Sequence, residues 1–289
     1  MNTALRFFLP LLLLLTLCTC DRAPEPATAD NSEPTARMSR QDSIQAVVER
    51  NSTVIPRNDP NPPAPGFNMA ASDPRAVQVA DSIVKYHGGR KLYDESRHFK
   101  WNFFGMRTLY WDKLEQRVRI EEKENDRISL LSYAGDTLTG RVRVGGTEIT
   151  DPAELREALR RANSIFINDS YWLVHQFKLK DSGVTLKWRG DIPTDPEVGR
   201  PCFIIDQTFA GVGDTPQNRY RLYVDKTTYR INTWQFFRDA ADEEPAMQTP
   251  WNGYVPYGGL LLSGDRGGDF TLTPIGVVER RRERLYQNF

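Results

Sequence analysis

The stretch HFKWNFFGMRTLYWDK, residues 98–113, decides the fold, because its apolar side chains have the spacing of β-strands. Phe99, Trp101 and Phe103 fall on one side of an extended chain, and Trp111 continues the pattern after a turn. A period of two with one apolar side is typical of a strand that lies on a core. The stretch therefore predicts a pair of antiparallel strands.

Three further segments, QRVRIEEK, DRISLLSY and GRVRVGG, repeat this pattern between residues 116 and 146. The apolar face is expected to be completed by aliphatic residues: Leu109, Val118, Ile120, Ile128, Leu130, Val142 and Val144. The opposite face carries mainly charged residues: Arg117, Arg119, Glu121, Arg141 and Arg143. These segments predict an antiparallel meander with one buried and one solvated face.

A helix is expected before the meander. Asp73 can cap it, Pro74 suits the first helical position, and Gly88 can end it. Ala76 and Ile83 belong to its apolar side, so the helix should lie on a core.

A pair of helices is expected after the meander. Asp151 can cap the first, with Pro152 at its first position and Glu154 placed for a capping box. A second, short helix is expected over residues 170–176, capped by Asp169.

Strand-like segments then resume: VTLKWRG, CFIIDQTF, NRYRLYVD, YRINTWQFFR, GGLLLSG and FTLTPIGVVER. The turn over residues 225–228 is expected to join two of them as a hairpin. The predicted fold class is α+β, mostly antiparallel β, in one domain over residues 74–289.

The N-terminal stretch LLLLLTLCTCDR, residues 11–22, ends an apolar run of roughly a dozen residues, whereas a spanning helix needs about 20. With Arg6 before it, the run fits an export signal, expected over residues 1–19. Leu17 and Thr19 before Cys20 resemble the lipobox of bacterial lipoproteins, although Thr19 departs from the Gly, Ala or Ser of that family. The resemblance implies that Cys20 carries the lipid; an ordinary signal peptide would leave no anchor.

Residues 20–73 differ in composition from the rest. They are rich in Pro, Ala, Asp, Asn, Ser and Thr, and Phe67 is their first aromatic residue. Such a segment buries too little apolar surface to offset the entropy of ordering it. It is expected to be a disordered tether between the lipid and the domain.

Charge and cysteine content exclude several classes of protein. The chain has 38 basic and 38 acidic residues, and only Arg6 would be lost with the signal. A neutral chain argues against a nucleic-acid partner. Cys202 is the only cysteine after Cys20, so it is expected to be a buried thiol and not part of a disulfide framework.

The order of elements behind a lipoprotein signal resembles the superfamily of bacterial carriers and lipoproteins related to LolA, LolB and LppX. Two stretches, NDSYWLVHQFKLKDSGVTLKW at 168–188 and RLYVDKTTYRINTWQFF followed by YGGLLLSGDR, look like an uncharacterised family of Bacteroidetes-type lipoproteins. The resemblance implies a curved half-barrel sheet that wraps an N-terminal helix and a central helical pair. It also implies an envelope location, expected at the outer membrane.

A sheet that curls around helices without closing can leave an apolar hollow for a lipid or the acyl chains of a lipoprotein. The candidate lining residues are aromatic: Trp101, Phe103, Trp111, Trp188 and Phe236. The alternative is that these side chains form an ordinary core.

No catalytic motif is evident. The sequence has no HExxH, CxxC or GxSxG pattern and no glycine-rich phosphate loop, so neither a metal nor a cofactor is expected. A carboxylate pair such as Glu122 with Asp206 stays open, since its separation is spatial. His175 is the histidine of most interest, and the run RRRER at 280–284 is expected to be a solvated tail.

Three functions remain open from the sequence. The leading one is a non-catalytic lipoprotein that binds an apolar ligand. A packed module that contacts other envelope proteins or glycan is the second, and a hydrolase with unrecognised carboxylates is the third.

Overall fold

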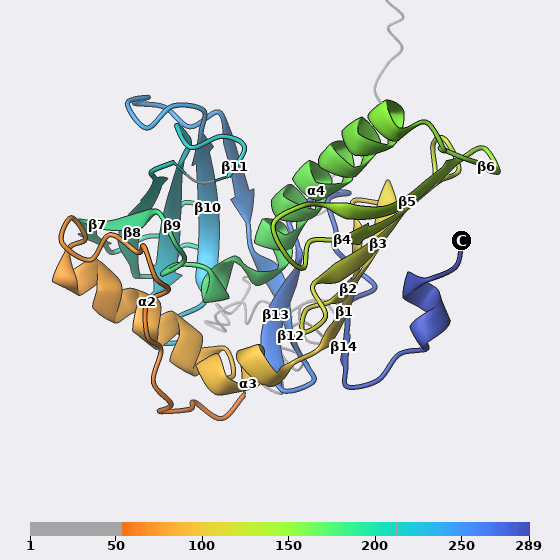
Figure 1. The fold of residues 1–289 in the computed structure, drawn as a ribbon. Helices are drawn as coiled ribbons and strands as arrows, with labels where there is room; N and C mark the ends of the chain where they lie inside the picture. Colours follow the sequence, from red (N-terminus) through yellow and green to blue (C-terminus); the bar gives the residue numbers. More distant parts are fainter. Residues whose placement is uncertain (1–53, 212) are drawn as a thin grey trace, which may run out of the picture. The chain divides into compact units, whose positions relative to one another are not determined.

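The computed structural model describes residues 54–211 and 213–289 (Figure 1), so the export signal, Cys20 and most of the expected tether lie outside the described residues. The strands pair antiparallel in three open sheets: a seven-stranded sheet, a five-stranded sheet and a two-stranded hairpin. With α2 and α4 packed on these sheets, the predicted α+β class, mostly antiparallel β, is confirmed. No helix among the described residues is long and apolar enough to cross a bilayer.

The seven-stranded sheet has the order β14-β1-β2-β3-β4-β5-β6. Its strands are β1 (His98–Phe103), β2 (Arg107–Asp112), β3 (Arg117–Glu122), β4 (Arg127–Ser132), β5 (Thr139–Val144), β6 (Thr147–Glu148) and β14 (Gly276–Val278). Trp101 pairs with Leu109, which pairs with Ile120, so the predicted apolar face is continuous across three strands.

The prediction of which β4 residues face the core is wrong by one residue. Ser129 pairs with Ile120 and Leu131 with Val118, so these two residues point into the core. Leu130 therefore lies on the outer face opposite Arg119. A shift of one residue exchanges the faces of a strand, and the consecutive apolar residues of this segment did not specify which face was which.

The five-stranded sheet has the order β11-β10-β9-β8-β7. Its strands are β7 (Val184–Ile192), β8 (Cys202–Phe209), β9 (Arg219–Asp225), β10 (Ile231–Phe237) and β11 (Met247–Pro250). The expected hairpin turn joins β9 to β10, because the Asp225 carboxylate accepts hydrogen bonds from the backbone N–H groups of Thr227 and Thr228.

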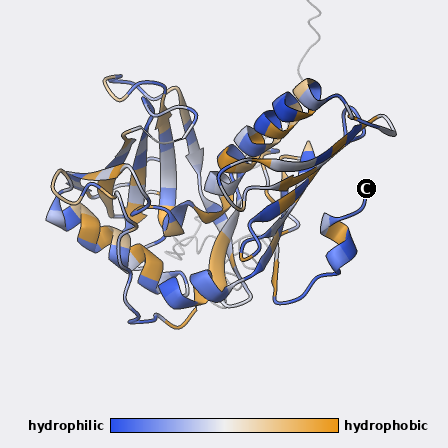
Figure 2. Ribbon diagram, viewed as in Figure 1, coloured by the Kyte–Doolittle hydropathy of each residue, from blue (hydrophilic) through white to orange (hydrophobic). Residues whose placement is uncertain are grey.

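Helix α2 (Pro74–Tyr86) packs against the five-stranded sheet through Ala76, Ala80 and Ile83. Figure 2 shows hydrophobic and hydrophilic residues on the same helix, as expected of an amphipathic helix. Asp73 occupies the N-cap position but its side chain does not cap the helix. Its carboxylate accepts from the backbone N–H of Trp188 at 2.9 Å instead, which ties the helix to β7.

Helix α4 (Pro152–Val174) packs against the seven-stranded sheet. Asp151 caps it as predicted, by accepting from the N–H groups of Ala153 and Glu154. The predicted break at Asp169 is wrong: the helix runs on to Val174, and a 3-10 turn, η1 (His175–Phe177), follows it.

Asp169 is a buried member of α4 and not a cap. Its two carboxylate oxygens accept from Arg107 at 2.6 and 2.8 Å. Burial raises the pKa of Asp169 although the guanidinium of Arg107 opposes the shift. The pair joins the helix to β2.

The hairpin of β12 (Asn252–Tyr257) and β13 (Leu260–Asp265) connects two hydrophobic cores. Leu260 and Leu262 belong to the core under the seven-stranded sheet, whereas Leu261 belongs to the core of the five-stranded sheet. Alternating side chains of one strand thus serve both cores. A short helix, α3 (Arg90–Glu95), follows α2 and contributes Tyr93 to the first core.

Residues 54–73, assigned by sequence to the tether, lie against the domain. The N–H of Ala64 donates to the carbonyl of Lys180, and that of Asn68 donates to the carbonyl of Val184. Phe67 is buried in the second core. The domain therefore begins before residue 74.

The C-terminal segment is not a free tail. The 3-10 turn η2 (Glu283–Tyr286) lies on the outer face of the seven-stranded sheet, where Tyr286 is buried. The Tyr286 hydroxyl lies 3.1 Å from Nδ1 of His98, and Nη2 of Arg117 donates to Glu283 at 2.7 Å. The solvated tail predicted for residues 280–284 is thus corrected: the turn docks on the charged face.

Candidate functional site

An aromatic cleft of about 300 Å³ lies between the C-terminal half of α4 and the inner face of the five-stranded sheet. Its lining residues are Asn168, Tyr171, Trp172, His175, Thr215, Asn218, Tyr220, Trp234, Phe236, Met247 and Trp251. A neighbouring hollow of about 430 Å³ shares Asn168, Tyr171, Thr215 and Tyr220 with it, so the two adjoin each other. We call the first of these the aromatic cleft.

The periodicities of helix and strand explain why these side chains meet. Residues 168, 171, 172 and 175 are spaced i, i+3, i+4 and i+7, which places them on one side of α4 and of the turn η1 that follows it. Trp234 and Phe236 are two apart on β10, and Tyr220 pairs with Phe236 across β9. One helical face therefore covers one strand face with aromatic rings on both sides.

The rings touch without filling the space between them. Trp172 and Trp234 have centroids 4.8 Å apart, and Tyr220 and Trp234 have centroids 5.2 Å apart. Trp234 is 6% exposed, but Tyr171, Trp172, Tyr220 and Phe236 are only half-buried. Apolar surface in the cleft thus remains in contact with water.

His175 forms the buried end of the cleft. Its Nε2 lies 2.5 Å from Oε1 of Gln207, whose amide nitrogen donates to the carbonyl of Lys178, so His175 is the donor in this pair. Burial lowers the pKa of His175 to about 4, and the hydrogen bond that His175 donates to Gln207 opposes this shift. A neutral imidazole that donates its proton to an amide oxygen is a structural part of the cleft wall.

Two indole N–H groups of the cleft lack acceptors. Nε1 of Trp234 and Nε1 of Trp251 are buried and have no hydrogen-bond partner among the residues that the structure describes. An unsatisfied buried donor costs about 1–3 kcal/mol.

The structure places the five predicted lining residues in different parts of the domain. Phe236 lines the cleft, whereas Trp101, Phe103 and Trp111 are buried in the core between the seven-stranded sheet and α4. Trp188 is half-buried near Arg75, whose guanidinium lies 5.5 Å from its ring centroid. These five residues therefore do not form one surface.

Several lining residues of the cleft were not named from the sequence: Tyr171, Trp172, Tyr220, Trp234 and Trp251. The sequence carried a signal for the first two, because Tyr171 and Trp172 lie in the helix expected over residues 170–176 and have helical spacing from His175. Trp251 lies between β11 and β12, where no periodic pattern marks it.

The carboxylate pair left open by the sequence does not form. Glu122 lies in β3 and accepts from Arg161, whereas Asp206 lies in β8 and accepts from Arg189, Arg219 and Arg221. Within the two described ranges no group of three or more His, Cys, Asp or Glu side chains could hold a metal ion. Cys202 is buried and free, and burial raises the pKa of its thiol to about 12.

No protein-family model and no curated protein matches the chain. Among solved structures, a DUF1329 family protein from Desulfovibrio piger is 11% identical and covers 73% of this chain and 97% of its own, with a TM-score of 0.41. A domain named as an outer membrane lipoprotein-sorting protein from Vibrio parahaemolyticus is 8% identical and covers 73% and 96%, with a TM-score of 0.36. MucB is 15% identical, covers 69% of this chain and 66% of its own, and has a TM-score of 0.22.

At these identities the likeness concerns the fold alone, and the TM-scores are too low to support a function. The function has to be argued from the cleft.

Proposed function

We propose that this protein is a non-catalytic, lipid-anchored protein of the bacterial envelope that binds an amphiphile with an acyl chain in the aromatic cleft. The observation that supports it best is the set of half-buried rings on facing sides of the cleft, from α4 and from β9 and β10. Ligand sites are mostly apolar hollows with a few polar groups, and their volumes are typically about 300–1,000 Å³. The cleft and the adjoining hollow fall in this range.

The energetics favour an acyl chain over a polar ligand. Each buried methylene contributes about 0.8 kcal/mol, so about eight methylenes supply about 6 kcal/mol before the cost of association. The amides of Asn168 and Asn218 and the hydroxyl of Thr215 lie at the cleft and offer hydrogen bonds to a head group.

The anchor of this proposal is Cys20, with the segment up to residue 53 as the tether. Several acyl chains on one cysteine hold a protein on a bilayer without a spanning helix. The tether would then hold the cleft at a distance from the membrane. There the cleft would bind amphiphiles that leave the membrane or are transported past it.

The proposal predicts that Phe236→Ala weakens binding of a fluorescent fatty acid by about tenfold, because a large apolar contact in the cleft is lost. Phe203→Ala is the matched control: Phe203 is also a half-buried phenylalanine of the five-stranded sheet, on β8, and it does not line the cleft. The measurement is a fluorescence titration of the full-length chain and both variants in detergent below its micelle concentration.

Equal affinities of the two variants would contradict a ligand in this cleft. Native mass spectrometry of the purified chain adds an independent observation, since a co-purified amphiphile is expected in the unmodified protein and is expected to decrease in Phe236→Ala.

A packed interaction module is the second candidate, and one observation favours it. Phe270 is 57% exposed and its ring centroid lies 5.2 Å from that of Phe104, so an aromatic patch faces solvent. If no fatty acid binds and Phe270→Ala abolishes capture of an envelope protein, this function replaces the first.

A further inference from the structure

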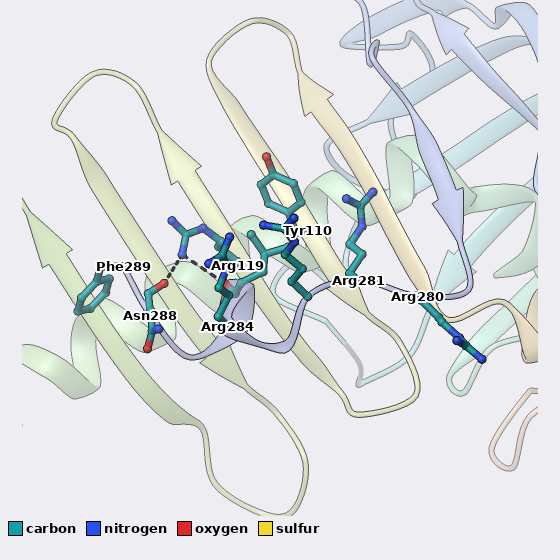
Figure 3. Close-up of a pocket in the computed structure, with 9 residues that line it drawn as sticks. Tyr110, Arg119, Arg280, Arg281, Arg284, Asn288 and Phe289 are labelled. Carbon is teal, nitrogen blue, oxygen red and sulfur yellow. Dashed lines mark hydrogen bonds between the residues drawn. The ribbon is translucent and has the colours of Figure 1, made fainter.

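Five arginines line one hollow on the outer face of the seven-stranded sheet, away from the aromatic cleft. The hollow has a volume of about 870 Å³. Its lining residues are Tyr110, Arg119, Arg280, Arg281, Arg282, Arg284, Leu285, Asn288 and Phe289 (Figure 3). No acidic residue of the described chain lines it.

The backbone that carries these arginines is held in place. Nη1 of Arg119 donates to the carbonyls of Leu285 and Asn288, at 3.3 and 2.6 Å, as the dashed lines in Figure 3 show. Tyr286 is buried against His98, and Glu283 is paired with Arg117. The segment that follows β14 is therefore docked at three points, so its arginines project from a fixed backbone.

Most of the positive charge of this hollow has no ion-pair partner: among its five lining arginines, only Arg119 is paired with a carboxylate of the described residues, that of Glu121. Glu283 is engaged by Arg117 and Glu121 by Arg119, so these two acids are already paired. Arg280, Arg282 and Arg284 have no carboxylate within ion-pair distance in residues 54–211 and 213–289. Like charges held close together repel one another, and a bound anion would offset that cost.

Arg281 supplies a second observation that points to a ligand. Its Nε is buried and has no hydrogen-bond acceptor in the described part of the chain, and its guanidinium lies 5.6 Å from the ring centroid of Tyr110. Figure 3 shows Arg281, Arg284 and Arg119 around Tyr110, whereas Arg280 points away from them. The hollow thus combines unengaged guanidinium donors with an aromatic wall.

We propose that this arginine hollow is a binding site for a ligand that carries more than one phosphate group. A guanidinium matches two oxygens of one phosphate through parallel N–H donors. A hollow of about 870 Å³ has room for several such groups on one ligand. The phosphates belong either to a soluble molecule or to lipid head groups at a membrane surface.

The test is calorimetric titration of the full-length chain with inositol hexakisphosphate and with inorganic phosphate, followed by flotation with vesicles of phosphatidylcholine with and without phosphatidic acid. The triple variant Arg281→Gln, Arg282→Gln, Arg284→Gln is expected to bind the hexakisphosphate at least about a hundredfold more weakly, because three charge-assisted contacts are lost.

The control removes the same charge elsewhere. Lys123→Gln, Arg156→Gln, Arg238→Gln changes three exposed residues that do not line the hollow, so its affinity should stay near that of the unmodified chain. Circular dichroism melting of both variants shows whether the fold is retained. A single Arg282→Gln change, expected to cost about tenfold, serves if the triple variant unfolds.

The outcomes separate the sources of phosphate. Tight binding of the hexakisphosphate without a preference for phosphatidic acid supports a soluble ligand, and a preference for phosphatidic acid that the triple variant loses supports lipid head groups. Equal effects of the triple variant and its control, or no binding of any phosphate probe, would overturn the proposal.

Discussion

At the scale of single residues, the buried histidines show how burial sets chemistry. His87 is fully buried, and its Nδ1–H donates to the carbonyl of Ile83 at 2.7 Å. Burial lowers the pKa of His87 to about 4, and the nearby charge of Arg230 lowers it further. His175 has a pKa of about 4 for the same main reason, with Lys178 and Arg266 as its positive neighbours. Both side chains are therefore neutral in the fold.

These two histidines predict acid sensitivity. A histidine with a lowered pKa in the fold is protonated first in the unfolded chain, so stability is lost as pH falls from about 6.5 toward about 4. Between about pH 7 and about pH 5, each histidine should reduce the free energy of unfolding by about 2 kcal/mol.

Urea denaturation of the full-length chain at several pH values measures this loss. The double variant His87→Gln, His175→Gln should be less stable at neutral pH but should show a much flatter dependence in the same interval. An unchanged slope in the double variant would mean that other groups cause the acid sensitivity.

At the scale of elements, α4 contacts both the seven-stranded sheet and the aromatic cleft. Its first turns cover the seven-stranded sheet and its last turns form one wall of the cleft. Arg266 holds the C-terminal end of this helix, because its Nη2 donates to the carbonyl of Trp172 in the last turn. Arg266 is 1% exposed and its guanidinium lies 3.8 Å from the ring centroid of Trp251, directly behind the cleft.

Replacing Arg266 tests this connection. Arg266→Met should reduce the free energy of unfolding by about 2–4 kcal/mol, because the acceptors on Trp172 and Ser263 lose a charged donor and Trp251 loses its cation–π partner. Arg238→Met, at an exposed position, should change stability by less than about 0.5 kcal/mol.

The cost of burying a charge opposes this stabilisation, and burial lowers the pKa of Arg266 to about 9. If Arg266→Met is as stable as the unmodified chain in urea, the arginine is not what holds the end of α4.

The elements also show what sequence can predict. Asp151 and Pro152 mark a helix start because capping is local, and the structure confirms it. The continuation of α4 past Asp169 could not be derived, since Arg107, which pairs with this acid, is 62 residues away in the chain. The face of β4 was misassigned for a related reason: only its pairing with β3 decides between Leu130 and Leu131.

At the scale of the whole domain, one core is closed and the other is not. Trp101 and Phe103 were expected to line a hollow, but both are buried in the core under α4, where the ring centroid of Phe103 lies 6.2 Å from that of Trp172. The apolar periodicity of a strand is the same whether a helix covers it fully or in part, so sequence predicted the aromatic faces but not which one stays open. The opening lies where α4 ends over β9 and β10.

The most direct test is quenching of tryptophan fluorescence by a fatty acid brominated in the middle of its acyl chain. Three of the six tryptophans, Trp172, Trp234 and Trp251, line the cleft, whereas Trp101 and Trp111 are buried in the other core. We predict that the brominated fatty acid at saturation quenches roughly half of the tryptophan emission, and that the unbrominated fatty acid does not. The reason is that bromine quenches a tryptophan only when the two are in contact inside one pocket. No quenching at saturation, or quenching that survives replacement of these three tryptophans by phenylalanine, would contradict an acyl chain bound in the aromatic cleft.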